Sequence, residues 1–436
     1  MTETKDITIN VPVLARVEGE GALELDIENG QVSNVKLRIF EPPRYFEKFL
    51  EGRDYNEVID TVARICGICP VAYQMSAVHA MERIFDMPAH PSIRALRRVM
   101  YCGEWLESHA LHIHLLAAPD FLGFKNAIEL AAAFPEEVKR GLHIQHLGNK
   151  LIKMLGGRSV HPVGVQVGGF YRIPTRQECA TLLAELNAAV EPAEQLVLWL
   201  ASLPLPQDEQ EFTCVALQHP QEYAMNEGNI VSSQGLDIPI DEYQDHFREI
   251  QAPHSTAFHS LLHDKPYLVG PLARVNLNWD RLHEPVKRLL EKTAIRFPSQ
   301  NVFHSVVARA VEIHYAIVEA IAILETIDLD TPPVKVTPKA GVGYGCTEAP
   351  RGLLWHRYEM NDQGLVVKAN IVPPTSQNQA RIEDDLRNGL NKIDLNQADD
   401  KIRLYAETII RNYDPCISCS THFLNLTVNR TCGESS

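Results

Sequence analysis

"RICGICP", residues 64–70, contains two cysteines separated by two residues, Cys66 and Cys69. A second such pair, Cys416 and Cys419, lies in "DPCISCSTH" (residues 414–422), near the other end of the 436-residue chain. Pairs of this kind occur as redox disulfides, as halves of four-cysteine zinc sites and as ligands of other soft metals. The interpretation depends on whether the two pairs meet in the folded chain.

Spacing and setting favour a metal centre without deciding which metal. A thioredoxin-type redox motif needs a βαβ setting, whereas helices are expected on both sides of residues 64–70. Zinc ribbons place their cysteine pairs about 15–20 residues apart, whereas nearly the whole chain separates these two. Four thiolates on one centre would suit nickel, iron or zinc rather than magnesium or calcium. Structural zinc therefore stays open.

The helix expected after Cys69 bears on the reactivity of this pair. Pro70 is typical of the first turn of a helix, and "VAYQMSAVHAMERIF" (residues 71–85) continues the helical pattern. Free backbone amides and the helix dipole at this end would favour thiolate over thiol. We therefore expect a reactive pair rather than an inert one.

Composition excludes several classes of protein. A formal net charge of −15 leaves no basic excess to neutralise phosphates, which argues against nucleic acid as the main partner. No run approaches the ~20 apolar residues that span a bilayer, so no membrane span is expected. The first residues, "MTETKDITIN", do not read as a signal peptide. Nine cysteines are too few and odd in number for a disulfide scaffold, which indicates a reducing, cytoplasmic setting.

Periodicity predicts an α+β fold that is mainly helical, with long central helices and peripheral β-hairpins. A hairpin is expected where Asn29-Gly30 separates the strands 22–28 and 31–40. A second β-region is expected over residues 352–360 and 365–372. Helices are predicted over residues 53–65, 92–118, 135–157, 176–203, 301–327, 377–390 and 399–414. No repeat or linker divides the chain, so residues 1–436 are expected to form a single domain.

The residues that flank the cysteines resemble one known family. "RICGICP" and "DPCISCSTH" are similar to the first and last signatures of the nickel–iron hydrogenase large subunit. Further stretches typical of the family occur in its order: "ARVEGEG" (15–21), "RYFEKFLEGRD" (44–54), "GGRSVHPVGVQVGG" (156–169), "TEAPRG" (347–352) and "IVPPTSQN" (371–378). Within the family the chain resembles the soluble, multi-subunit NAD(P)-linked type, also called sulfhydrogenase. That narrower resemblance rests on "ARVEGEG", "GEWLESHALHIHLLAAPDF" (103–121) and "YDPCISCSTH" (413–422).

The resemblance implies a set of metal ligands. Cys66, Cys69, Cys416 and Cys419 would hold nickel, and Cys69 and Cys419 would also bridge to an iron that carries CO and CN⁻. The implied reaction is the reversible splitting of H2 into two protons and two electrons. The thiolate of Cys419 would take part in catalysis by accepting the first proton.

Other residues are implied to act around the metals. Without the family match Glu18 would be interpreted as an ordinary strand glutamate, but "RVEG" at this position resembles the motif of the proton-relay carboxylate. Arg351 resembles the arginine that sits over the metals and donates to CN⁻, where a surface ion pair is the alternative. Thr375, after Pro374, would hydrogen-bond another diatomic ligand. Asp414 is expected to form an ion pair near the site, unless it only ends a helix.

The resemblance also implies a magnesium ion and a processed C-terminus. Glu47, His422 and the backbone carbonyl of Ile371 would bind the magnesium. His109, with His112 and His114 on the same expected helix, is interpreted as a neighbour of the site or as a packing residue. Residues 423–436 are expected to be removed by a maturation protease after nickel-insertion factors have acted, with loss of Cys432.

Electron transfer requires other chains. Apart from the two pairs, the remaining cysteines are isolated, so an iron–sulfur relay is expected on a small partner subunit. No G-x-G-x-x-G motif opens a helix after a strand, so no dinucleotide site is expected on this chain. The resemblance to the NAD(P)-linked type implies that FAD and NAD(P) are bound by diaphorase-type flavin and iron–sulfur subunits of a heterotetramer. Three alternatives stay open: an F420- or viologen-linked soluble hydrogenase, a complex I-type quinone-site subunit, which has lost the nickel cysteines, and a structural subunit with four-cysteine zinc.

Overall fold

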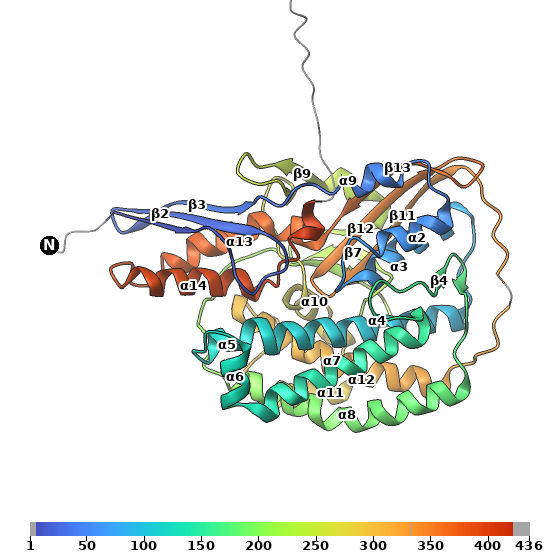
Figure 1. The fold of residues 1–436 in the computed structure, drawn as a ribbon, viewed down its shortest axis with the longest axis horizontal. Coiled ribbons are helices and arrows are strands. Elements are labelled where there is room, and N and C mark those ends of the chain that lie inside the picture. The colour runs from blue at the N-terminus through green and yellow to red at the C-terminus, as the bar shows by residue number, and fades with distance from the viewer. Residues whose placement is uncertain (1–5, 333, 422–436) are drawn as a thin grey trace, which may run out of the picture.

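The computed structural model describes residues 6–332 and 334–421. It combines a layer of long helices with small antiparallel sheets and shorter helices stacked on the other side (Figure 1). This is the α+β, mainly helical fold that the sequence predicts. Within the described residues, the helices include none that is both long and apolar enough to cross a bilayer.

Four long helices form the lower layer of Figure 1. Helix α4 packs against α7 and α12, and α12 packs against α8. Local signals set their ends: α7 begins at a proline followed by two glutamates, and Thr175 and Glu178 form a capping box at the start of α8. The bounds of these helices are α4 (Pro91–Leu111), α7 (Pro135–Gly156), α8 (Arg176–Ser202) and α12 (Ser305–Thr326).

Shorter helices complete the structure. Three of them position the candidate site, namely α3 (Pro70–Ile84), α13 (Pro374–Leu390) and α14 (Asp399–Asn412). A π-helix (His112–Ala117) continues α4. The others are α1 (Phe46–Leu50), α2 (Tyr55–Val62), α5 (Ala118–Phe121), α6 (Ala127–Ala133), α9 (Tyr243–His246), α10 (Pro271–Asn278) and α11 (Glu284–Glu291).

The strands pair in small antiparallel sheets. The three-stranded sheets are β1 (Ile7–Val11), β2 (Gly21–Glu28) and β3 (Gln31–Ile39); β6 (Val215–Gln218), β7 (Asn229–Ser232) and β8 (Asp237–Ile238); and β11 (Gly341–Ala349), β12 (Gly352–Met360) and β13 (Val366–Val372). The hairpins are β4 (Val165–Gln166) with β5 (Gly169–Phe170), and β9 (Phe247–Gln251) with β10 (Phe258–Leu262).

The β2–β3 hairpin forms where the sequence predicts it. Asn29 and Gly30 adopt φ of 52° and 74°, which are the positive values that a type I′ turn requires. The predicted apolar face, Leu23, Leu25 and Ile27, is buried. Helices α3 and α13 likewise occupy the predicted regions, and α3 begins at Pro70 itself.

Strand β11 was not predicted. It carries glycines where a strand pattern would show large side chains, and it packs directly on α3. A Cβ at Gly343 would lie 2.2 Å from the carbonyl oxygen of Ala80, and one at Gly345 would lie 1.9 Å from that of Ser76. Only glycine permits this approach. The close contact therefore requires glycines where a predictable strand would show alternating large side chains.

The two ends of the described chain lie together. Glu18 pairs with Cys416 in a parallel bridge, and α13 packs on both β3 and β10. The main hydrophobic core includes residues from both ends, such as Leu25 and Cys419. A single domain over residues 1–436 stays a prediction, because part of that range lies outside the described residues.

Candidate metal centre

The four paired cysteines meet in one buried cluster. Cys66 and Cys69 lie on the loop between α2 and α3, and Cys416 and Cys419 lie on the segment after α14. One sulfur from each lies within 4.8 Å of the others. The Sγ of Cys66 is 2.6 Å from that of Cys69 and 3.7 Å from that of Cys416. The fold therefore brings together two loops that are separated by most of the sequence.

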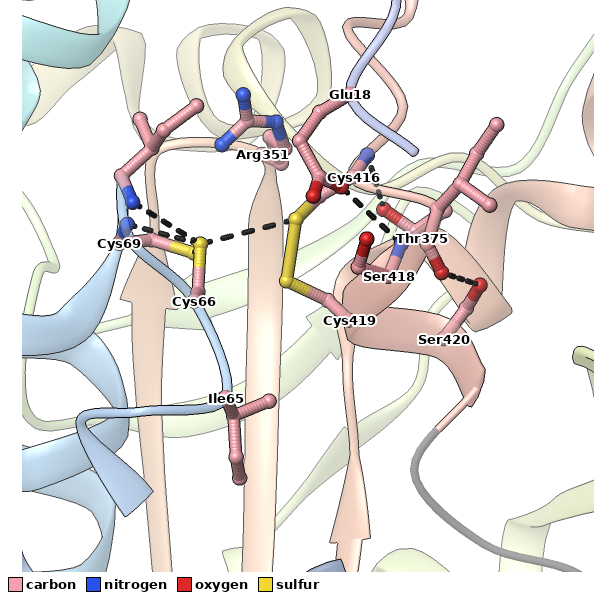
Figure 2. The surroundings of a disulfide bond; sticks show 12 residues. Glu18, Ile65, Cys66, Cys69, Arg351, Thr375, Cys416, Ser418, Cys419 and Ser420 are labelled. Atoms are coloured by element: carbon pink, nitrogen blue, oxygen red, sulfur yellow. Dashed lines mark hydrogen bonds between the residues drawn. A yellow bond between two sulfur atoms is a disulfide. The ribbon is translucent and has the colours of Figure 1, made fainter. Parts of the chain in front are cut away.

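Figure 2 shows how the four cysteines lie relative to one another. Cys416 and Cys419 are joined as a disulfide, whereas the thiols of Cys66 and Cys69 are not. Since thiolate is the form that binds metal, all four sulfurs act as ligands only when this disulfide is reduced.

Arg44 joins the two cysteine loops, a role that sequence reasoning missed. Its guanidinium donates to the carbonyl oxygen of Ile65 at 2.8 Å and also to that of Ser418. Its backbone N–H donates to the carbonyl of Thr421 at 2.6 Å. One side chain thus fixes the residue before Cys66 against the residue before Cys419. The only available signal was its place in "RYFEKFLEGRD".

The thiols of the first pair have opposite pKa shifts. Burial alone raises the pKa of the Cys66 thiol, but the hydrogen bond from Cys69 and the charge of Arg351 outweigh it, so the net pKa is lowered. Burial raises the pKa of the Cys69 thiol well above its usual value, and Cys66 adds to that rise. The first thiolate therefore forms on Cys66.

The backbone amides that stabilise the Cys66 thiolate are not the ones that the sequence predicts. The amides that reach the Cys66 sulfur belong to Ile68 and Cys69, at 3.4 and 3.0 Å. The amides of the first turn of α3, those of Val71 and Ala72, instead donate to the buried carboxyl of Glu104, at 2.6 and 3.1 Å. The expectation that the start of α3 offers free amides to a thiolate was therefore wrong for these two groups. Sequence reasoning gave no role to Glu104, because nothing in the α4 pattern marks it.

Arg351 lies in the turn between β11 and β12 and is buried. Its Nε donates to the carbonyl of Asp414 at 2.6 Å, and one terminal nitrogen donates to the Asp414 carboxylate at 3.0 Å. Its Nη1 is buried without a hydrogen-bond partner among the described residues. Burial lowers the pKa of Arg351, but Asp414 and the two thiols raise it by more, so the guanidinium stays charged.

Asp414 forms the ion pair that the sequence predicts. Burial raises the pKa of its carboxyl, while the charge of Arg351 and further contributions from His112 and Arg309 lower it to a net value below the usual one. The residue adopts a φ of 56°, which turns the chain out of α14 toward Cys416.

Glu18 and Thr375 both contact the second cysteine loop (Figure 2). The Glu18 carboxylate accepts from the N–H of Ser418 at 3.1 Å, and its carbonyl accepts from the N–H of Ile417 at 3.0 Å. Thr375 lies in the first turn of α13, after Pro374, and its hydroxyl accepts from the N–H of Cys416 at 3.0 Å. Both side chains are therefore held next to the cysteines.

Two of the three predicted magnesium ligands lie together. The Glu47 carboxylate on α1 accepts from the N–H of Ile371 on β13 at 2.6 Å. Burial raises the pKa of Glu47 to about 7. Glu249, which sequence reasoning missed, has its pKa raised to about 8, mainly by burial and further by the nearby Glu47. The third predicted ligand, His422, lies outside the described residues, as does the tail over 423–436.

The three histidines of α4 and the π-helix do not converge. His109 bonds to Glu312 of α12 at 2.9 Å, and Glu312 pairs with Arg274. His112 contacts the carbonyl of Arg411, and His114 contacts that of Ala110. His109 thus belongs to a buried ionic network between helices.

Comparison with known proteins identifies the class to which this fold and cysteine cluster belong. The chain matches the nickel-dependent hydrogenase family over residues 44–141 and 260–422. It belongs to that family.

Individual relatives are similar along nearly their whole length. The chain is 34% identical to the alpha chain of sulfhydrogenase 1 of Pyrococcus furiosus, with 96% of this chain and 99% of that protein covered. It is 30% identical to a subunit of the F420-non-reducing hydrogenase vhu of Methanocaldococcus jannaschii, with 86% and 96% covered. The crystal structure of an NAD+-reducing nickel–iron hydrogenase in the H2-reduced state superposes with a TM-score of 0.87 at 26% identity, covering 95% of this chain and 99% of that one.

Proposed function

We propose that this chain is the catalytic large subunit of a nickel–iron hydrogenase that interconverts H2 with two protons and two electrons and exchanges the electrons with NAD(P). The single observation that carries the proposal is the buried cluster of four cysteine sulfurs from opposite ends of the chain. Membership of the hydrogenase family supplies the reaction class.

The donor set fits the expected metals. Four sulfur ligands suit nickel, and Cys69 and Cys419 would also help to hold the iron, because thiolates are soft ligands. The unpartnered Nη1 of Arg351 fits a CN⁻ ligand on that iron, and the Thr375 hydroxyl retains a proton to donate to another diatomic ligand. When bound, the nickel–iron group supplies the site at which H2 is split.

Proton transfer falls to residues of this chain. Once the disulfide is reduced, the Cys419 sulfur would accept the first proton as a thiolate. The Glu18 carboxylate, which is hydrogen-bonded to the residue before Cys419, would receive the proton and pass it outward. Asp414 would hold Arg351 in place, because it binds two of the three guanidinium nitrogens.

We also propose the magnesium site formed by Glu47, the Ile371 carbonyl and His422. The contact between Glu47 and Ile371 supports it, and the nearby carboxyl of Glu249 adds an oxygen donor of the kind that magnesium prefers. A cation there would also offset the repulsion between the two carboxylates.

The electrons need partner subunits. Within the described residues, the cysteine cluster at the centre is the only group of three or more cysteines close enough to share a metal. A small iron–sulfur subunit would therefore carry electrons away, and diaphorase-type flavin and iron–sulfur subunits would deliver them to NAD(P) in a heterotetramer. The names of the relatives, as subunits of larger enzymes, support this arrangement. The cytoplasmic location stays a prediction from the sequence.

Removal of residues 423–436 belongs to the same proposal. A maturation protease would cut after His422 once nickel-insertion factors have loaded the site. Intact-mass measurement of the active complex should give a chain that ends at His422, and an active chain that retains the tail would contradict this part.

The electron acceptor is tested with the purified multi-subunit complex. H2-dependent reduction should be measured in parallel with NAD+, NADP+, F420 and a viologen dye. We expect reduction of NAD+ or NADP+, in line with the likeness to the NAD+-reducing enzyme. Reduction of the viologen alone would instead support a viologen-linked hydrogenase, the second candidate, which the likeness to the F420-non-reducing enzyme favours. Reduction of F420 would support the F420-linked type, and a nickel-loaded complex with no H2 activity toward any acceptor would overturn the proposal.

A further inference from the structure

A second group of potential metal ligands lies outside the cysteine cluster. His254 on the loop between β9 and β10, His259 on β10 and Glu383 on α13 each place one ligand atom within 4.8 Å of the other two. The Nε2 of His254 is 2.7 Å from one Glu383 oxygen, and the Nε2 of His259 is 3.7 Å from the other. Glu383 is more than two helical turns from Thr375 along α13, so this group is separate from the cysteine cluster.

Hydrogen bonding within this group does not explain why His259 is buried. Its side chain is only 4% exposed, and both of its ring nitrogens lack a hydrogen-bond partner among the described residues. Burying a polar group without a hydrogen-bond partner is destabilising. The 3.7 Å separation from Glu383 is too long for a hydrogen bond but leaves room for an ion bound by both groups.

The carboxylate of Glu383 is oriented by a neighbouring element. Its Oε1 accepts from the backbone N–H of Leu37 on β3 at 2.8 Å. Such an outer hydrogen bond is typical of carboxylates that bind metal. The side chains of Glu383 and His254 keep 16% and 21% of their area exposed, so water can reach the group.

We propose that His254, His259 and Glu383 bind one divalent cation of the zinc class. Two imidazole nitrogens and one carboxylate, with a remaining position for water, form a set that suits Zn²⁺ rather than Mg²⁺ or Ca²⁺. Bonds of about 2.0–2.1 Å in tetrahedral geometry would separate ligand atoms by about 3.3 Å. The observed separations, from 2.7 Å to within 4.8 Å, bracket that value, so small side-chain movements complete the site.

The ion would join three parts of the chain that meet beside α13. His254 and His259 come from the β9–β10 hairpin, Glu383 comes from α13, and Leu37 brings in β3. The first turn of α13 contacts Cys416 through Thr375. A cation bound at Glu383 would therefore stabilise the position of this helix from a site away from the metal centre. The proposal does not depend on the proposed hydrogenase activity.

The test uses Zn²⁺ as the probe on the purified multi-subunit complex. Zinc should be titrated after mild chelation, and its content and zinc-edge X-ray absorption should then be measured. We expect one zinc per chain, with a nearest shell of nitrogen and oxygen at about 2.0–2.1 Å. The nickel and iron edges report separately on the cysteine cluster, so failure of the two proposals can be told apart.

Variants locate the zinc. Glu383→Gln keeps the shape of the side chain, and we expect it and His259→Ala each to weaken zinc binding at least tenfold. His263→Ala is the matched control, because it removes a histidine from the exposed His246–His263 pair, whose ring nitrogens are 3.0 Å apart. Its zinc binding should stay unchanged.

Three results would overturn the proposal. One is the absence of zinc from the wild-type complex. Another is a zinc–sulfur shell near about 2.3 Å, which would place zinc at the cysteines. The third is equal zinc binding by the wild type and Glu383→Gln. If His259→Ala fails to fold, Glu383→Gln decides alone.

Discussion

At the scale of single residues, two arginines organise the cysteine cluster. Arg44 binds backbone carbonyls of both cysteine loops, and Arg351 binds Asp414, two residues before Cys416. A guanidinium group offers several donors in fixed directions, so each of these arginines can bind more than one acceptor. The positions of the four sulfurs therefore depend on side chains that are not metal ligands.

Replacing a proposed metal ligand should reduce H2 uptake far more than replacing another buried cysteine does. We expect Cys419→Ser to abolish H2 uptake and to leave residues 423–436 attached, because the metals cannot be held and maturation stalls. Cys214→Ser is the control, since Cys214 is also buried but lies outside the cluster, where its sulfur accepts a hydrogen bond from Asn276 at 3.6 Å. That variant should retain most activity. Equal losses in activity and equal tail retention in both variants would refute the ligand assignment.

The proposed proton relay makes a separate prediction. Glu18→Gln keeps the hydrogen bond to Ser418 but removes the group that carries the proton, so hydrogen–deuterium exchange activity should fall by about 10²–10⁴-fold. Nickel content should stay unchanged. Glu20→Gln is the control, because Glu20 is exposed on the same segment, and its exchange activity should match the wild type. Nickel loss in Glu18→Gln would show that Glu18 is structural instead.

At the scale of elements, close backbone packing explains why strand β11 could not be predicted from the sequence. The β2–β3 hairpin and α3 were predictable, because a two-residue turn and an N-terminal proline are local signals. Strand β11 was not, since Gly343 and Gly345 are fixed by contact with α3 and leave no alternation to detect. The π-helix after α4 was also hidden, because the sequence predicts one uninterrupted helix over residues 92–118.

The packing of β11 on α3 can be tested directly. Gly345→Ala places a Cβ within 1.9 Å of the Ser76 carbonyl, so the backbone must shift, and we expect a loss of stability of about 1–3 kcal/mol. Gly341→Ala on the same strand meets no backbone atom, and its nearest neighbour is the Cγ2 methyl of Ile84, at 3.2 Å. Thermal unfolding of the complex should show a lower midpoint for the first variant and little change for the second. Matching midpoints would contradict the packing argument.

At the scale of the whole molecule, the centre exists only because the first and last parts of the described chain meet. The ligand set was predicted from resemblance to a family, since cysteine spacing alone left zinc open. The contact of Glu18 with the Cys416 loop could not be derived from sequence, because it depends on how the first sheet lies against α13 and α14. The roles of Arg44 and Glu104 were missed for the same reason.

Buried histidines should make the stability of the fold sensitive to acid. Burial lowers the pKa of His114 to about 4, while the unfolded value is near 6.5. Because the unfolded chain binds the proton more readily, stability is lost as pH falls from about 6.5 toward 4, and this residue contributes about 2 kcal/mol of that loss between pH 7 and 5. His114→Gln should therefore show a smaller drop in thermal midpoint between those pH values. An unchanged pH dependence would refute the assignment.

The infrared spectrum of the purified, processed complex tests the central claim most directly. Ordinary protein groups do not produce the stretching bands of iron-bound CO and CN⁻. The proposed cluster of Cys66, Cys69, Cys416 and Cys419 predicts these bands in the wild type and their absence in Cys419→Ser. A nickel-loaded wild-type complex without such bands, or bands that persist unchanged in Cys419→Ser, would contradict it.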